Sequence, residues 1–291
     1  MLQALDIFDP SSYPTRRDEN WKYSDLSRVL RVVPANAKQS DDGDIVEVAP
    51  GKSMKQLVRL TDGGTYNEML RFRLGEGAEL IRVIILDEPE DAVSIYRSTV
   101  ETAPGSTFKQ YVFSTGAKFQ RFETHIEHAG HGASVELHGA YLLKDKAHFD
   151  LTTRVNHTQP GGVTQQLIKG LVKDQATAVF QGRIKVERGA DGTDARMRHQ
   201  ALMLNDGAHV RAKPELEIYA DDVQCAHGNT IGAMDEAALF FCQSRGMDES
   251  TARQLLMQAF IMPVADQIED EELRAKVLEF LEDKSRGFYA V

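Results

Sequence analysis

The sequence predicts a mainly β protein that ends in a small helical domain. Apolar and polar residues alternate with a period of two over 133–141, 149–155, 180–187 and 215–219. Such alternation is typical of strands with one buried and one hydrated face. Beyond Gly232 the period changes to that of amphipathic helices. We therefore expect a lead-in segment over 1–34, a β core over 35–233 and a helical domain over 234–291.

A recurring glycine divides the β core into units of similar length. The glycines lie 28, 27, 30 and 27 residues apart, at Gly77, Gly105, Gly132, Gly162 and Gly189. Units made of a turn and strands, without a helix, are typical of stacked coils in which each coil buries its face against the next. The same alternation is compatible with a β-sandwich. Periodicity alone therefore leaves a β-helix and a β-sandwich open.

Three amphipathic helices are predicted after the core, over about 236–245, 248–262 and 270–284. Asp235 is a suitable N-cap for the first helix, and Gly246 is a suitable C′ residue after it. Pro263 is expected to break the second helix. We expect the apolar stripes of these helices to pack on one another and on the last coil of the core.

The composition limits the class of partner and the compartment. With 34 Lys and Arg against 44 Asp and Glu the formal charge is −10, which argues against a nucleic acid or an anionic membrane as the main partner. No apolar run approaches the roughly 20 residues of a membrane span, and no basic-then-apolar leader follows Met1. Two cysteines do not make a disulfide framework. The sequence therefore predicts a cytoplasmic protein.

Cys225 and His227 are the candidate metal or sulfur ligands. Residues i and i+2 of a strand share one face and lie roughly 6.5 to 7 Å apart, so the two side chains can reach one metal ion. A tetrahedral thiolate and imidazole centre needs about four donors, and the only other cysteine, Cys242, falls in a predicted helix. The missing donors would come from a partner chain or from exogenous ligands. Arg211 and Lys213 would lower the pKa of the Cys225 thiol if they face it.

Other motifs are interpreted as structural. His125, His128 and His131 surround Glu127, but on a strand His125 and His128 face opposite sides, so we expect a solvated strand end. His157 is expected to bond a backbone carbonyl in a turn. The chain contains neither G-x-x-x-x-G-K-[ST] nor a strand-to-helix G-x-G-x-x-G, so we expect it to bind neither ATP nor a dinucleotide through these motifs.

Two blocks of sequence resemble one family. Residues 213–247, KPELEIYADDVQCAHGNTIGAMDEAALFFCQSRGM, are similar to the C-terminal signature of SufD, the scaffold subunit that works with SufB and the ATPase SufC in iron–sulfur cluster assembly. Residues 14–26, PTRRDENWKYSDL, resemble the segment that leads into the core of that family. SufB carries Glu-His-Glu where this chain has Cys225-Ala226-His227, so the resemblance is to the SufD family within the SufB/SufD superfamily. It extends from about Tyr13 onward.

The resemblance implies a right-handed parallel β-helix and a non-catalytic scaffold. It implies pairing with a SufB-like scaffold, docking of a SufC-like ABC ATPase on the C-terminal helices, and a cluster-forming interface near Cys225 and His227. The chain alone is expected to bind no cofactor, and a transient iron or iron–sulfur cluster would be shared with SufB. Without SufB, the strand edge over 215–223 is expected to pair with a second copy as a homodimer. Longer SufD proteins carry an N-terminal helical domain, which we expect to be missing here.

Two alternatives have other functions. The first is a purely structural subunit that only positions its partners. The second is a β-helix carbohydrate-active enzyme, which is disfavoured because no strand-spaced carboxylate cluster with a basic residue is found in the sequence.

Overall fold

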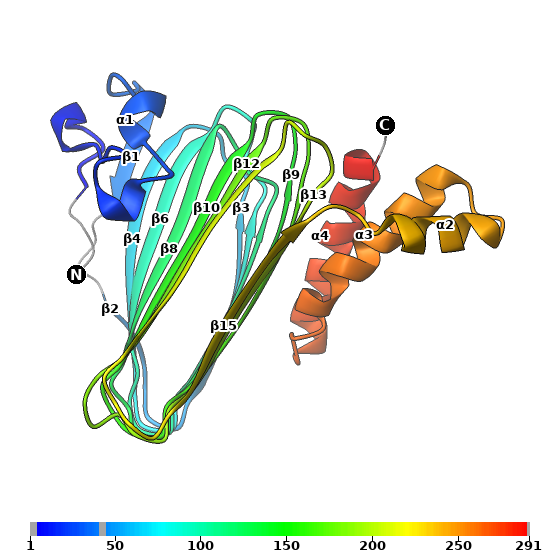
Figure 1. The fold of residues 1–291 in the computed structure, drawn as a ribbon. Helices are drawn as coiled ribbons and strands as arrows, with labels where there is room; N and C mark the ends of the chain where they lie inside the picture. The colour runs from blue at the N-terminus through cyan, green and yellow to red at the C-terminus, as the bar shows by residue number, and fades with distance from the viewer. Residues whose placement is uncertain (1–4, 41–44, 290–291) are drawn as a thin grey trace.

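The computed structural model describes residues 5–40 and 45–289. Residues 1–4 of the predicted lead-in and 290–291 of the predicted helical domain lie outside the described residues. The centre of the molecule is a stack of coils between a lead-in segment and a group of helices (Figure 1). None of the described helices combines the length and the apolar character that a membrane span needs.

Two parallel sheets form the stack. The first contains β1 (Ala37–Ser40), β2 (Ile45–Val48), β4 (Thr65–Leu74), β6 (Val93–Glu101), β8 (Phe119–His128), β10 (His148–His157), β12 (Thr177–Val186) and β14 (His209–Ile218). The second contains β3 (Ser53–Leu60), β5 (Glu79–Leu86), β7 (Thr107–Ser114), β9 (Ser134–Leu143), β11 (Val163–Val172), β13 (Asp194–Met203) and β15 (Gln224–Gly232).

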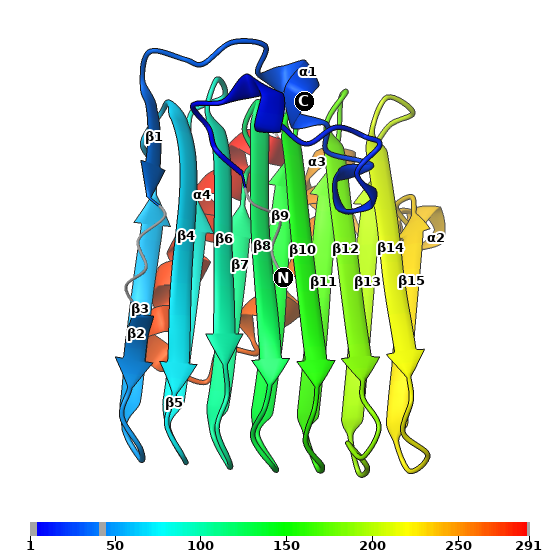
Figure 2. The same cartoon turned by 90° about the vertical axis from the view of Figure 1, so that its left-hand side faces the viewer.

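The chain passes from one sheet to the other at nearly every turn. From β3 onward successive strands alternate between the sheets, and each strand pairs in parallel with the strand two further along the chain (Figure 2). A chain that winds in this way is a parallel β-helix. The predicted β-helix is therefore confirmed, and the β-sandwich alternative is wrong.

Inward-facing side chains stack in register along the lumen. Tyr141, Phe149 and Phe180 are among the largest fully buried side chains of this core. The recurring glycines occupy turns, and Gly77, Gly105, Gly132 and Gly189 have positive φ angles between 62° and 83°. In the remaining unit Gly161 has the positive φ, at 69°, and not the predicted Gly162.

The lead-in segment lies across the outer face of the first sheet (Figure 2). It contains two 3-10 helices, η1 (Pro10–Ser12) and η2 (Glu19–Trp21), and one helical turn, α1 (Leu26–Val29). Ile7, Tyr13, Trp21 and Leu26 are buried there against Val93, Ile95 and Phe119. The Trp-Lys-Tyr block of the sequence therefore serves to anchor this segment on the coil stack.

Three helices follow the last strand, and two of them, α3 and α4, cover the outer face of the second sheet (Figure 1). The three are α2 (Glu236–Ser244), α3 (Glu249–Ala265) and α4 (Glu271–Tyr289). The apolar faces of α3 and α4 pack on outward side chains of β5, β7, β9 and β11, such as Val83, Phe113 and Leu142. The expectation that the helices pack on the last coil is wrong, because the apolar outer surface lies in the middle of this sheet.

Helix ends follow the sequence signals in part. The Asp235 carboxylate accepts hydrogen bonds from the backbone N–H groups of Ala237 and Ala238, and Gly246 has a φ of 92°, so both predicted caps are confirmed. Pro263 does not break α3, which continues to Ala265. A proline so close to the helix end removes only one hydrogen bond of the last turn.

Candidate functional site

The last coil leaves both sheets with an open edge. Within the described residues, β14 pairs only with β12 and β15 pairs only with β13. Apolar side chains of this coil are therefore only partly covered, including Leu216, Ala220 and Val223, which pack against the lumen core. Exposed strand edges of this kind are templates for pairing with another chain.

Cys225 and His227 lie on the lumen-facing side of β15. Cys225 is in register with Ala195 and His227 with Met197, and both of these β13 residues are buried in the lumen core. The Cys225 side chain is half-buried against that core, whereas His227 is exposed. The pair therefore sits at the open end of the lumen.

The surroundings of the Cys225 thiol do not activate it. Burial raises its pKa, the Asp194 carboxylate adds to this, and a backbone hydrogen bond from Ala195 opposes it. Lys213 forms ion pairs of 2.5 Å with Glu19 and 3.2 Å with Glu215 on the outer face of β14. The thiol would therefore need a metal ion or a partner cation to ionise near neutral pH.

Arg211 likewise lies on the outer face of β14. Its guanidinium stands 5.9 Å from the centre of the Tyr23 ring, on the lead-in segment. The condition for a lowered thiol pKa, that Arg211 and Lys213 face Cys225, is therefore not met.

The pair does not complete a metal site within residues 5–40 and 45–289. No group of three or more His, Cys, Asp and Glu side chains in these ranges is arranged to hold a metal ion. Cys242 is half-buried on α2. Further donors for Cys225 and His227 would have to come from outside this part of the chain.

The histidines near the ends of β8 and β10 have structural roles. His125 lies 2.7 Å from the Glu123 carboxylate on the outer face. His128 is fully buried and stacks on His157 with ring centres 4.3 Å apart, so the expected solvated strand end is wrong for His128. His157 bonds the Thr164 hydroxyl at 2.9 Å, and not the expected backbone carbonyl.

A serine, a histidine and an aspartate meet beneath the lead-in segment, a grouping that the sequence did not indicate. Ser24 Oγ lies 3.0 Å from His148 Nε2 and donates to Asp150. Asp150 also accepts from the buried Arg121 at 2.5 Å, while the Trp21 ring lies 4.1 Å from that guanidinium. The carboxylate binds the serine and not the imidazole, and Ser24 is fully buried. The cluster fastens the lead-in and does not activate a nucleophile.

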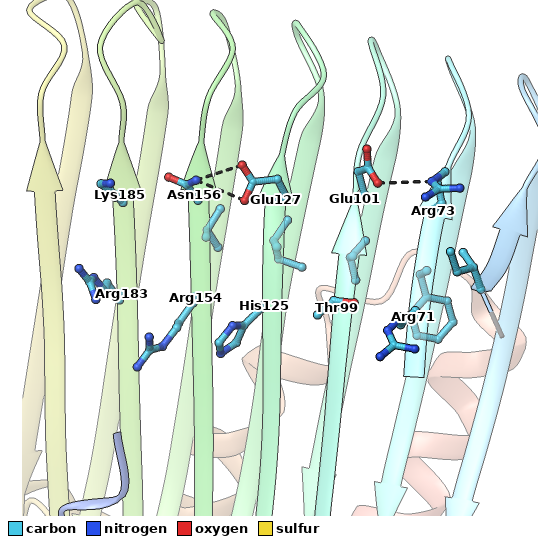
Figure 3. Close-up of a pocket in the computed structure, with 15 residues that line it drawn as sticks. Arg71, Arg73, Thr99, Glu101, His125, Glu127, Arg154, Asn156, Arg183 and Lys185 are labelled. Atoms are coloured by element: carbon cyan, nitrogen blue, oxygen red, sulfur yellow. Dashed lines mark hydrogen bonds and ion pairs between the residues drawn. The ribbon is translucent and has the colours of Figure 1, made fainter. Parts of the chain in front are cut away.

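A trough of about 520 Å³ crosses the outer face of the first sheet (Figure 3). One of its walls is an in-register row of five side chains, Arg71, Thr99, His125, Arg154 and Arg183. Its charges are largely matched, since Arg73 pairs with Glu101 at 3.3 Å and Arg183 pairs with Glu217. In the sequence, these residue types recur at intervals of about one coil length. This recurrence is the only feature of the sequence that could have predicted the row.

The chain is a parallel β-helix with a cysteine and a histidine side chain at the open end of its lumen. The family model described as SUF system FeS cluster assembly, SufBD core domain, matches residues 36–260. The chain belongs to this family.

Three curated relatives match most of this chain. The iron–sulfur cluster assembly protein SufD of Escherichia coli is 28% identical over 236 residues, 81% of this chain and 56% of that protein. Protein ABCI7, chloroplastic, of Arabidopsis thaliana is 30% identical over 224 residues, 76% of this chain and 47% of that protein. A SufBD family protein of Synechocystis is 29% identical over 204 residues, 70% of this chain and 45% of that protein. The chain spans about half the length of these relatives.

Proposed function

We propose that this chain is a non-catalytic scaffold subunit of the SUF machinery, in which its last coil pairs with a SufB-like scaffold. The observation that carries the proposal is the position of Cys225 and His227 on the lumen-facing side of a terminal strand that has one open edge. Addition of a partner strand to β15 would bring the partner's side chains up to the same two donors. The family to which the chain belongs supports this reading.

The nascent iron–sulfur cluster is the cargo of this interface. Thiolate and imidazole both bind iron, and the two donors leave positions for sulfide and for ligands of the partner. His227 is exposed and can bind without rearrangement. Cys225 has a raised pKa and would ionise only as the metal binds. We therefore assign the leading role to His227.

The helical domain supplies a second docking surface, for a SufC-like ABC ATPase. Phe240 and Phe241 on α2 are 72% and 58% exposed, and Met247 and Leu255, which follow in the sequence, are also exposed. The exposed aromatic pair is the kind of anchor that a partner buries at the centre of an interface.

The reducing compartment that suits two free cysteines is the cytoplasm.

A purely structural role is the second candidate. It is favoured by one observation, that Cys225 packs against the lumen core and has a raised pKa, as a small apolar residue would. In that case the last coil would only position the partner scaffold.

Affinity purification from the native host tests the partners. The tagged chain should bring down a SufB-like protein and an ABC ATPase, and Ile231→Asp should lose the SufB-like protein because it places a charge in the joined lumen. Thr230→Asp, on the outward side of the same strand, is the matched control.

The isolated chain adds a second readout of the same edge. At high micromolar concentration light scattering should report a homodimer for the unsubstituted chain and a monomer for Ile231→Asp. Retention of the SufB-like protein by Ile231→Asp would contradict the proposed interface.

A further inference from the structure

The first coil, at the opposite end of the stack, contains a cavity of about 520 Å³ between the two sheets. Its walls are mostly apolar and include Val58 of β3, Leu70 and Phe72 of β4, Ile84 of β5 and Phe122 of β8. A neighbouring cavity of about 400 Å³ shares the side chains of Leu60, Glu68 and Tyr96. Mostly apolar cavities of this size with a few polar groups are typical of small-molecule sites.

Arg82 brings a buried positive charge to one wall. Only 2% of the residue is exposed, and its guanidinium lies 4.3 Å from the centre of the Phe72 ring. Nε donates to Gln56 Oε1 at 3.1 Å and Nη1 to Gln110 Oε1 at 3.0 Å, both neutral amides. Burial lowers the pKa of Arg82 to about 10, so the side chain is charged at neutral pH. Within the described residues Nη2 makes no hydrogen bond and no carboxylate pairs with this cation.

Glu68 brings the opposite charge to the facing wall. It is half-buried on β4 and makes no hydrogen bond or ion pair with any described residue. Burial raises the pKa of Glu68 and the charge of Arg82 lowers it, so the two groups sense each other without touching. A buried charge without a direct ionic partner is costly, so a ligand that pairs with both Arg82 and Glu68 would stabilise the two groups.

The other charged side chains of this cavity already have partners. Lys55 forms an ion pair of 2.6 Å with Asp270, and Arg97 donates to Asn67 Oδ1 at 3.0 Å. The ligand therefore has to pair with one cation and one carboxylate. A plain carboxylate would leave Glu68 facing a second anion, and a plain amine would leave Arg82 without a counter-charge.

We propose that this cavity binds a small zwitterion with an apolar body, of the class of apolar α-amino acids. The ligand carboxylate accepts from Arg82 Nη2, and the ligand ammonium donates to Glu68. The apolar side chain lies on Leu70, Phe72 and Ile84. Such a ligand has no net charge and pairs with both Arg82 and Glu68.

Isothermal titration calorimetry of the full chain with leucine tests the proposal. Leucine should bind, whereas 4-methylpentanoate, which lacks the ammonium group, and 3-methylbutylamine, which lacks the carboxylate, should each bind at least ten-fold more weakly. Glu68→Gln should weaken leucine at least ten-fold and should remove the preference for leucine over 4-methylpentanoate. Glu101→Gln, an exposed change on the outer face of the same sheet, is the matched control.

Arg82→Met extends the test to the other wall, with circular dichroism to show that the variant folds. Because Arg82 is buried, its replacement can also disturb folding. The Glu68→Gln variant therefore tests the proposal independently of Arg82→Met. Absence of leucine binding at millimolar concentration would overturn the proposal. So would equal binding of leucine and 4-methylpentanoate to the unsubstituted chain.

Discussion

At the scale of single residues, the stacked rings of His128 and His157 explain why residue 162 is a glycine. The repeat pattern predicted a glycine at this position but gave no reason for it. A Cβ added at Gly162 would lie 2.6 Å from His157 Nδ1 and 2.7 Å from His128 Cε1. The two imidazoles are fully buried and cannot move aside without disturbing the lumen. Gly162 is therefore required by close contact, whereas Gly161 is required by its positive φ.

Gly162→Ala should lower the free energy of unfolding by about 1 to 3 kcal/mol through overpacking. Gly228→Ala is the control, because a Cβ there meets nothing within 4 Å and the residue has no positive φ. The control should leave stability unchanged or raise it by about 0.4 to 1 kcal/mol. Urea midpoints of the two variants provide the measurement, and equal midpoints would show that the histidine pair is loosely packed.

The orientation of the site residues could be predicted by counting alternate positions. Cys225 and His227 share a face as expected, and the same parity sends Arg211 and Lys213 to the outer face of β14. Parity does not reveal partners far apart in sequence. The contacts of Arg82 with Gln56 and Gln110 join three coils, and only the register of the coils brings them together.

At the scale of elements, the residue composition of the strands determines where α3 and α4 pack. β5 reads Glu-Leu-Ile-Arg-Val-Ile-Ile-Leu, a nearly continuous apolar run, which indicates a strand covered on both faces. α3 and α4 cover its outer face, and α2 extends beyond the sheet (Figure 1). The position of α3 and α4 could have been predicted from that run, but the partner of α2 could not.

The double variant Phe240→Ser/Phe241→Ser should abolish binding of a SufC-like ATPase. Both rings are already exposed, so the change should leave the circular dichroism and the thermal midpoint nearly unchanged. Lys276→Ser/Glu279→Ser, on the exposed face of α4, is the matched control. Surface plasmon resonance with the ATPase gives the measurement, and undiminished binding by the phenylalanine variant would exclude α2 as the docking element.

At the scale of the whole molecule, buried histidines couple the stability of the coil stack to pH. Burial lowers the pKa of His157 to about 3, with a further contribution from His128, and it lowers the pKa values of His148 and His199 to about 4. These side chains are neutral in the folded chain, while in the unfolded chain they take up protons below about pH 6.5. The unfolded state therefore binds more protons under acidic conditions.

The contribution of these histidines to the free energy of unfolding should be constant above about pH 6.5. It should fall as the pH decreases toward 4. Each histidine contributes up to about 1.4 kcal/mol per pH unit in that window. Guanidinium unfolding at pH 7.5, 6.5, 5.5 and 4.5 measures the slope. His131→Gln should leave the slope unchanged because His131 is exposed, and a stability that does not change over this range would show that the buried histidines are charged in the fold.

We propose that His227 supplies a ligand for cluster assembly at a shared interface. The direct measurement is the rate of cluster formation in the reconstituted complex with SufB-like and SufC-like partners, followed by absorbance and by iron and sulfide content. His227→Ala should fold and assemble normally but form clusters at least ten-fold more slowly, with Cys225→Ala showing a similar or smaller loss and His131→Ala none. Cluster formation by His227→Ala at the unsubstituted rate would contradict the claim and leave the chain as a purely structural subunit.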